Sequence, residues 1–121
     1  MARVLIVDDS PTETHILRSI VEKMGHSVAT ASSGEDGVSA AKALSPDLIL
    51  MDVVMPGLNG FQATRELSKT PETSRIPVVV VSTKDQQTDR VWALRQGARE
   101  YLVKPVQPKT LEQVIRQLLD E

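Results

Sequence analysis

Apolar residues follow two alternating patterns along the chain. Short uninterrupted apolar runs are typical of strands buried on both faces, and weaker alternation is typical of an outer strand. Between these runs, apolar residues recur at the spacing of an amphipathic helix. The patterns predict strands at residues 3–7, 27–31, 48–51, 78–81 and 100–103, and helices at about residues 11–24, 34–44, 61–69, 86–96 and 108–119. Strands and helices alternate without a linker or repeat, so we expect one domain over residues 1–121.

Local signals place the ends of the first helix. Ser10 is predicted to be its N-cap, with Pro11 at the first helical position and Glu13 completing a capping box. Gly25 is predicted to end the helix. In the fourth predicted helix, Trp92 is interpreted as an aromatic anchor that packs the helix rather than as a functional residue.

The alternation of strands and helices predicts an α/β fold with a parallel sheet covered by helices on both faces. Right-handed crossovers place the carboxyl ends of all parallel strands at the same edge of such a sheet. We therefore expect the polar residues that follow the strands to form one pocket there. These residues are Asp8, Asp9, Asp52, Ser82 and Lys104.

Asp52 stands at the point where an apolar strand gives way to a turn. The turn residues Pro56, Gly57, Asn59 and Gly60 follow it closely. We therefore expect its carboxylate to be exposed at the mouth of a loop.

The predicted pocket has the composition of a phosphoryl-transfer site. Crowded carboxylates repel one another, and a hard divalent cation with oxygen ligands relieves that repulsion. Mg²⁺ suits this role because it keeps waters that a phosphate can replace, and we expect Mn²⁺ to substitute for it. Lys104 and Ser82 add donors for negative charge, while Asp52 supplies an attacking oxygen.

Each of these residues taken alone has a simpler explanation. Asp8 and Asp9 before a helix are often caps, and Ser82 is more often a cap than a phosphate donor. A lone Asp52 or Lys104 would usually be a turn or loop residue. The ordered set at matching strand ends favours a functional site.

Composition narrows the classes of partner. The chain has no cysteine, which suits a reducing compartment, and we expect a cytoplasmic protein. A formal charge of -2 with mixed signs argues against nucleic-acid binding. No apolar segment approaches the length of a membrane span, so we expect no membrane insertion.

The motif set resembles the receiver family of two-component response regulators over essentially the whole chain. It comprises Asp8-Asp9, Asp52, Met55-Pro56, Gly60, Ser82 and Lys104-Pro105. The resemblance implies a doubly wound, flavodoxin-like (CheY-like) three-layer sandwich with strand order 2-1-3-4-5. A narrower likeness to single-domain receivers of twitching motility is carried by residues 56–65, 83–86 and 91–92.

The resemblance also implies a role for each site residue. Asp52 would be the phosphoryl acceptor. Asp9, Asp52 and the Val54 carbonyl would be Mg²⁺ ligands, and Asp8 would bind the ion largely through water. Lys104 would pair with the phosphate, and the bond between Lys104 and Pro105 is usually cis in the family. The switch residues would be Ser82, which bonds a phosphoryl oxygen, and Tyr101.

The implied function is that of a stand-alone, monomeric response regulator. A histidine kinase would donate the phosphoryl group, and a downstream target protein would bind the face formed by the helix at 86–96, the strand at 100–103 and the helix at 108–119. We expect it to assist its own phosphorylation and dephosphorylation without being an enzyme, and to act in pilus-based twitching motility or taxis.

Three alternatives remain at this point. A phosphatase with an aspartyl-phosphate intermediate would need a second Asp two residues after the nucleophile, where Val54 stands. A phosphate sink would use the same site only to drain phosphate from a pathway. A pseudo-receiver would bind partners without phosphorylation, which the complete acidic set disfavours.

Overall fold

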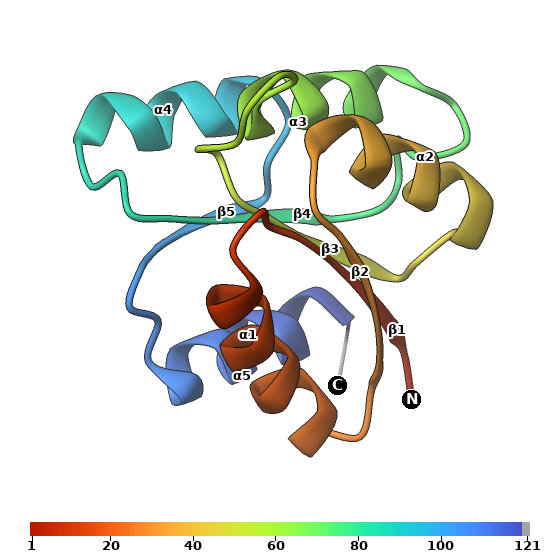
Figure 1. Ribbon diagram of the computed structural model, residues 1–121, viewed down its shortest axis with the longest axis vertical. Coiled ribbons are helices and arrows are strands. Elements are labelled where there is room, and N and C mark those ends of the chain that lie inside the picture. Colours follow the sequence, from red (N-terminus) through yellow and green to blue (C-terminus); the bar gives the residue numbers. More distant parts are fainter. Residues whose placement is uncertain (120–121) are drawn as a thin grey trace.

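A five-stranded parallel sheet forms the centre of the computed structural model, which describes residues 1–119 (Figure 1). In chain order the elements are β1 (Arg3–Val7), α1 (Pro11–Lys23), β2 (Ser27–Ala31), α2 (Gly34–Leu44), β3 (Leu48–Met51), α3 (Gly60–Lys69), β4 (Val78–Ser82), α4 (Gln87–Arg95), β5 (Glu100–Val103) and α5 (Pro108–Leu119). The strand order β2-β1-β3-β4-β5 confirms the predicted fold class. The order reverses between β1 and β3, where open parallel sheets bind their ligands.

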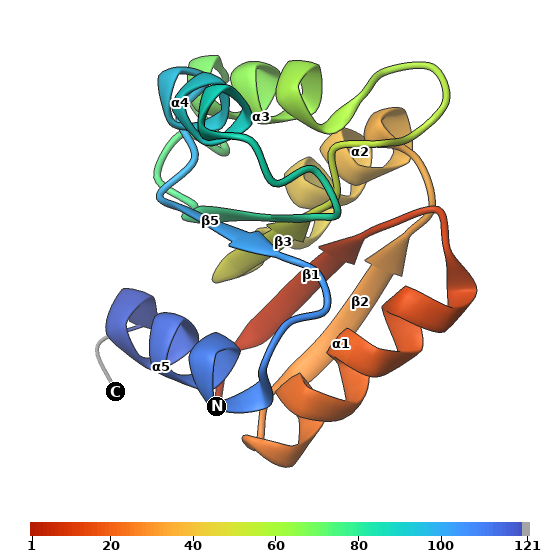
Figure 2. The ribbon, with the colours of Figure 1, turned by 90° about the vertical axis from the view of Figure 1, so that its left-hand side faces the viewer.

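The helices form two layers, with α1 and α5 on one face of the sheet and α2, α3 and α4 on the other (Figures 1 and 2). Alternate residues of β1 pack against the two helical layers. Val4 and Ile6 belong to the core cluster beneath α1 and α5, whereas Leu5 and Val7 belong to the cluster beneath α2 and α3. A strand that contributes to both cores must be apolar at every position, which explains the uninterrupted runs in the sequence.

β4 begins at Val78, the first of the four valines predicted to form it. One local prediction is corrected. The Ser10 side chain does accept the N–H of Glu13, but the Ser10 N–H donates to Asp8 Oδ1 at 2.9 Å. The predicted capping box with Glu13 is therefore wrong, because the site carboxylate binds that donor.

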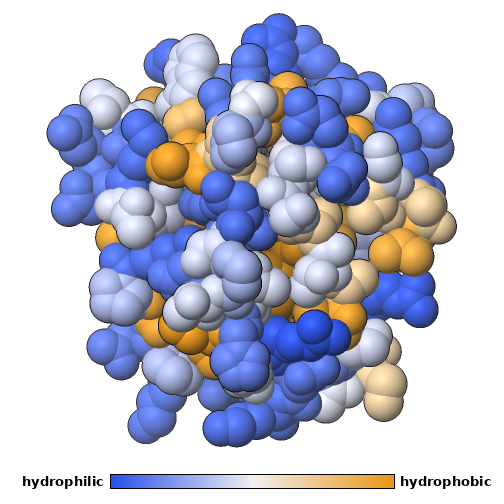
Figure 3. All heavy atoms as spheres, in the orientation of Figure 1, coloured by the Kyte–Doolittle hydropathy of each residue, from blue (hydrophilic) through white to orange (hydrophobic). Residues whose placement is uncertain are grey.

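The prediction that Trp92 packs α4 against the core is also wrong. Only Ala93 of α4 is buried, whereas the side chains of Trp92, Val91 and Leu94 are exposed. The face of the molecule drawn in Figure 3 is mostly hydrophilic, with apolar residues in small separate patches. Within residues 1–119, no helix is both long enough and apolar enough to cross a membrane.

Gly60 provides a test of how closely α3 approaches the strand end. A Cβ at this position would overlap the main-chain carbonyl oxygen of Asp52. We expect Gly60→Ala to lower the free energy of unfolding by about 2–3 kcal/mol, measured by urea denaturation, because the loop must shift to admit the methyl group.

The control is Gly25→Ala, which adds the same methyl group at φ +94° with no atom within 4 Å. The added methyl group meets no steric overlap at this position, so we expect Gly25→Ala to lose only the about 1–2 kcal/mol that backbone strain costs. Equal losses in the two variants would contradict the proposed close approach.

Candidate functional site

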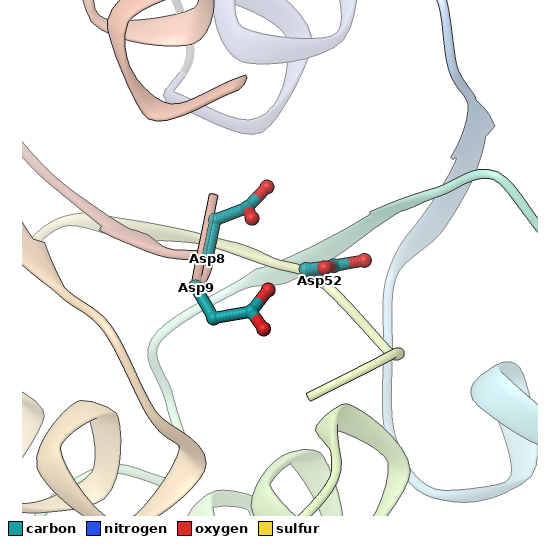
Figure 4. Close-up of side chains that lie close together, drawn as sticks. All are labelled: Asp8, Asp9 and Asp52. Atoms are coloured by element: carbon teal, nitrogen blue, oxygen red, sulfur yellow. The ribbon is translucent and has the colours of Figure 1, made fainter. Parts of the chain in front are cut away.

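Three carboxylates meet at the carboxyl edge of the sheet. Asp8 and Asp9 follow β1, and Asp52 follows β3, which is the neighbouring strand (Figure 4). The Asp52 N–H donates to the Val7 carbonyl at 2.9 Å, so the two strand ends are held in register. One oxygen from each carboxylate lies within 4.8 Å of the others. The structure therefore brings together the acidic residues that the sequence places far apart.

Asp52 is buried, contrary to the expectation of an exposed carboxylate. Its exposed fraction is 7%, and Val53 and Met55, which follow it, are also buried. This burial raises the pKa of Asp52. Lys104 and the main-chain N–H groups of Val53 and Val54 act in the opposite direction, and the charge of Asp8 adds to the increase.

Lys104 is the cation of the site. Its Nζ lies 2.7 Å from Asp8 Oδ2 and 3.9 Å from Asp52 Oδ1, and its side chain is 7% exposed. The Lys104 N–H donates to the Ser82 carbonyl at 2.8 Å, which fixes the residue beside β4. The peptide bond to Pro105 is cis, as the resemblance implies. Sequence reasoning missed the ion pair with Asp8, since no local signal links residues 96 positions apart.

Ser82 and Tyr101 are joined through the main chain of Lys84. Ser82 Oγ accepts the Lys84 N–H at 3.3 Å, and the Tyr101 hydroxyl donates to the Lys84 carbonyl at 2.7 Å. Both Ser82 and Tyr101 are buried, and burial raises the pKa of the Tyr101 phenol. Sequence reasoning named both switch residues but did not identify Lys84 as the connection between them.

Val54 lies beside the acidic cluster with its side chain exposed. Its main-chain N–H lies close enough to Asp52 to lower the pKa of that carboxyl, which places the Val54 backbone at the site. The use of the Val54 carbonyl as a metal ligand stays a prediction.

The donor set fits a hard divalent cation. Asp8, Asp9 and Asp52 supply carboxylate oxygens only, and Mg²⁺ favours oxygen ligands from one or two carboxylates together with water. Asp9 is exposed, so the cluster remains open to solvent on that side. Within the described residues, Lys104 is the cation paired with this cluster, so the three carboxylates keep a net negative charge that a divalent cation would balance.

Comparison with known proteins decides the family. The model of the response regulator receiver domain matches residues 4–116. The chain belongs to the response regulator receiver family. It is therefore a receiver domain of a two-component response regulator, and receivers take phosphoryl groups from histidine kinases.

Related proteins align with this receiver over almost its whole length. Protein PilH of Pseudomonas aeruginosa is 60% identical over 119 residues, which cover 98% of each chain. The transcriptional regulatory protein AfsQ1 of Streptomyces coelicolor is 36% identical, and the alignment covers 98% of this receiver but 52% of AfsQ1.

Solved structures agree with the fold. Chemotaxis protein CheY4 of Vibrio cholerae has a TM-score of 0.91 and 28% identity, over 98% of this receiver and 99% of that chain. The receiver domain of sensor histidine kinase PA1611 from Pseudomonas aeruginosa has a TM-score of 0.91 and 28% identity, over 99% and 98% of the two chains. That structure is described with a magnesium ion coordinated in its active site cleft.

The buried ion pair of Lys104 predicts a large loss of stability when the charge of this lysine is removed. We expect Lys104→Met to lower the free energy of unfolding by about 3 kcal/mol in the presence of chelator, because Asp8 and Asp52 lose their buried cation. The measurement is urea denaturation at neutral pH.

Arg18→Met is the matched control. Arg18 forms an exposed pair with Glu22 at 3.3 Å, and such a pair contributes at most about 0.5 kcal/mol. Losses of similar size in the two variants would show that the buried pair has no special weight.

The raised pKa of Asp52 predicts how stability depends on pH. The folded protein holds this proton more tightly than the unfolded chain, so stability falls as pH rises from the unfolded pKa through the raised folded value. Asp52→Asn removes the free-energy cost of burying an ionised carboxylate at this position. In chelator, we expect it to be more stable than the parent at pH 7 and to lose the advantage toward pH 4.

Chemical denaturation of both proteins at the two pH values makes this comparison. A constant difference between them would rule out titration of Asp52 as the cause. Added Mg²⁺ should stabilise the parent more than Asp52→Asn, because the variant lacks one carboxylate ligand.

Proposed function

We propose that this receiver accepts a phosphoryl group on Asp52 from the phosphohistidine of a kinase, in a reaction that depends on Mg²⁺. The observation that carries the proposal is the buried Asp52 carboxylate, with two further acids within 4.8 Å and the Lys104 ammonium at 3.9 Å. An oxygen of Asp52 would attack the phosphorus. The bond from phosphorus to the histidine nitrogen then breaks, and its electron pair remains on the imidazole.

Asp8, Asp9, Asp52 and the Val54 carbonyl would hold the cation, and Mn²⁺ would substitute for Mg²⁺. A bound divalent cation supplies charge neutralisation for the phosphoryl oxygens. Lys104 would exchange its contact with Asp8 for one with the phosphoryl group, since its ammonium already lies between the two carboxylates. Ser82 would donate its hydroxyl to another phosphoryl oxygen.

The connection through Lys84 gives phosphorylation a route to the surface. A shift of the Ser82 hydroxyl toward the phosphoryl group would carry the Lys84 main chain with it, because Ser82 Oγ accepts the Lys84 N–H. The Lys84 carbonyl holds the Tyr101 hydroxyl, so Tyr101 and the surrounding surface of β5 would respond.

We infer that the face formed by α4, β5 and α5 binds the downstream target. Its support is the exposed apolar surface of Val91, Trp92 and Leu94 on α4 and of Val103 on β5. The 60% identity with PilH supports the finer proposal of a role in twitching motility or taxis, which follows from the likeness and not from the site geometry.

The phosphatase alternative lacks support at one position. A general acid two residues after the nucleophile would need a titratable side chain, and Val54 offers none. We therefore propose a phosphoacceptor that assists its own phosphorylation and dephosphorylation. The phosphate-sink role would use the same chemistry and differ only in having no downstream target.

The test is incubation with acetyl phosphate and Mg²⁺, followed by intact mass measurement. We expect one added phosphoryl group on the parent, loss of labelling in Asp52→Asn, and loss of labelling in the parent when chelator replaces Mg²⁺.

Asp47→Asn is the control, because Asp47 precedes the same strand at its opposite end and accepts the Arg3 N–H. It should be labelled like the parent. Labelling that survives in Asp52→Asn would move the acceptor to another residue. Rapid release of phosphate without an accumulated adduct would favour the phosphatase instead.

A further inference from the structure

The N-terminal end of α2 holds the tip of the loop that joins β3 to α3. Glu35 Oε2 accepts the Leu58 N–H at 3.2 Å. A Cβ on Gly34 would overlap the Leu58 carbonyl, and a Cβ on Gly57 would lie 3.0 Å from Glu35 Oε2. Figure 2 shows this loop passing beside the end of α2. The contact therefore requires a backbone approach that side chains at either glycine would obstruct.

The other end of the same loop carries the acidic site. Asp52 begins the loop, and the Gly60 N–H closes its base by donating to the Val53 carbonyl at 3.1 Å. Met55 is buried in the core beneath α2 and α3, whereas Val54 between these fixed points is exposed. The loop is thus fixed at its base by main-chain bonding, in its middle by Met55, and at its tip by Glu35.

We propose that Glu35 is a positioning residue for the divalent-cation site. By holding Leu58, it restrains the loop that presents Asp52 and the Val54 backbone, so that less conformational freedom is lost when a cation binds. This inference rests on the proposed function, because it concerns the cation that Asp8, Asp9 and Asp52 would hold.

The location of Glu35 makes the role separable from core stability. Glu35 lies in the first turn of α2, where a helix N-terminus favours negative charge. Its side chain lies on the surface and outside the three apolar core clusters. Truncation should therefore loosen the loop without opening a cavity.

The experiment measures Mg²⁺ affinity by calorimetry in the parent, Glu35→Ala, Glu35→Gln and Asp36→Ala. We expect Glu35→Ala to weaken binding by about three- to tenfold, which corresponds to the loss of one net hydrogen bond. Glu35→Gln should retain most of the affinity, because its amide oxygen can accept the Leu58 N–H. Asp36→Ala removes a negative charge from the same helical turn, in the pocket that Asp36 lines together with Asp8 and Asp9, without touching the loop. It measures the effect of charge alone and should weaken binding less than Glu35→Ala does.

Two further readouts separate positioning from general destabilisation. Without metal, Leu58 amide hydrogen exchange should be faster in Glu35→Ala than in the parent and near the parent rate in Glu35→Gln. In Glu35→Ala, the Mg²⁺ concentration that gives half of the maximal rate of phosphorylation by acetyl phosphate should be higher than in the parent. The maximal rate itself should equal that of the parent.

The outcomes distinguish this inference from the proposed function. If the parent binds no Mg²⁺, the proposed cation site fails, and the inference fails with it. If the parent binds Mg²⁺ but Glu35→Ala binds equally well, only the role of Glu35 is overturned. If Glu35→Gln and Asp36→Ala both weaken binding as much as Glu35→Ala does, the effect is one of charge, and the positioning role is likewise overturned.

Discussion

The concentration of negative charge at one edge of a buried sheet governs the rest of this molecule. Two of the three carboxylates, Asp8 and Asp52, are buried, and repulsion between them is offset within the described residues by one buried cation, Lys104. Burial raises the pKa of Asp52 despite Lys104, and the negative charge that remains among the three carboxylates is why the site suits a divalent cation.

Such a cluster can persist only on a rigid support. The central strands have apolar residues on both faces, so their positions are fixed by two cores at once. Close backbone approaches then hold the loop that follows β3. Gly60 admits the start of α3 against Asp52, and Gly34 admits α2 against Leu58. Small residues are needed at these points because packing of the helices, and not local turn chemistry, sets the available space.

The site and the surface differ in how firmly they are packed. Asp52, Ser82 and Tyr101 are buried and hydrogen-bonded, whereas α4 contributes only Ala93 to the buried core. A helix with so little buried surface can move at low cost when the loop before it changes. The hydrogen bonds from Ser82 through Lys84 to Tyr101 therefore connect the charged pocket to β5, the strand beside α4, and α4 has the fewest buried residues of the described helices.

The sequence by itself determined the element order, the fold class and the residues at the strand ends, because apolar periodicity and turn residues act over short distances along the chain. Tertiary structure alone decided which of those residues touch. The pairing of Lys104 with Asp8, the burial of Asp52 and the exposure of Trp92 all depend on neighbours from distant elements. A local pattern reflects only the average tendency of each residue type to be buried. The burial and ion pairing of a particular side chain depend on the distances that the packed helices and sheet impose.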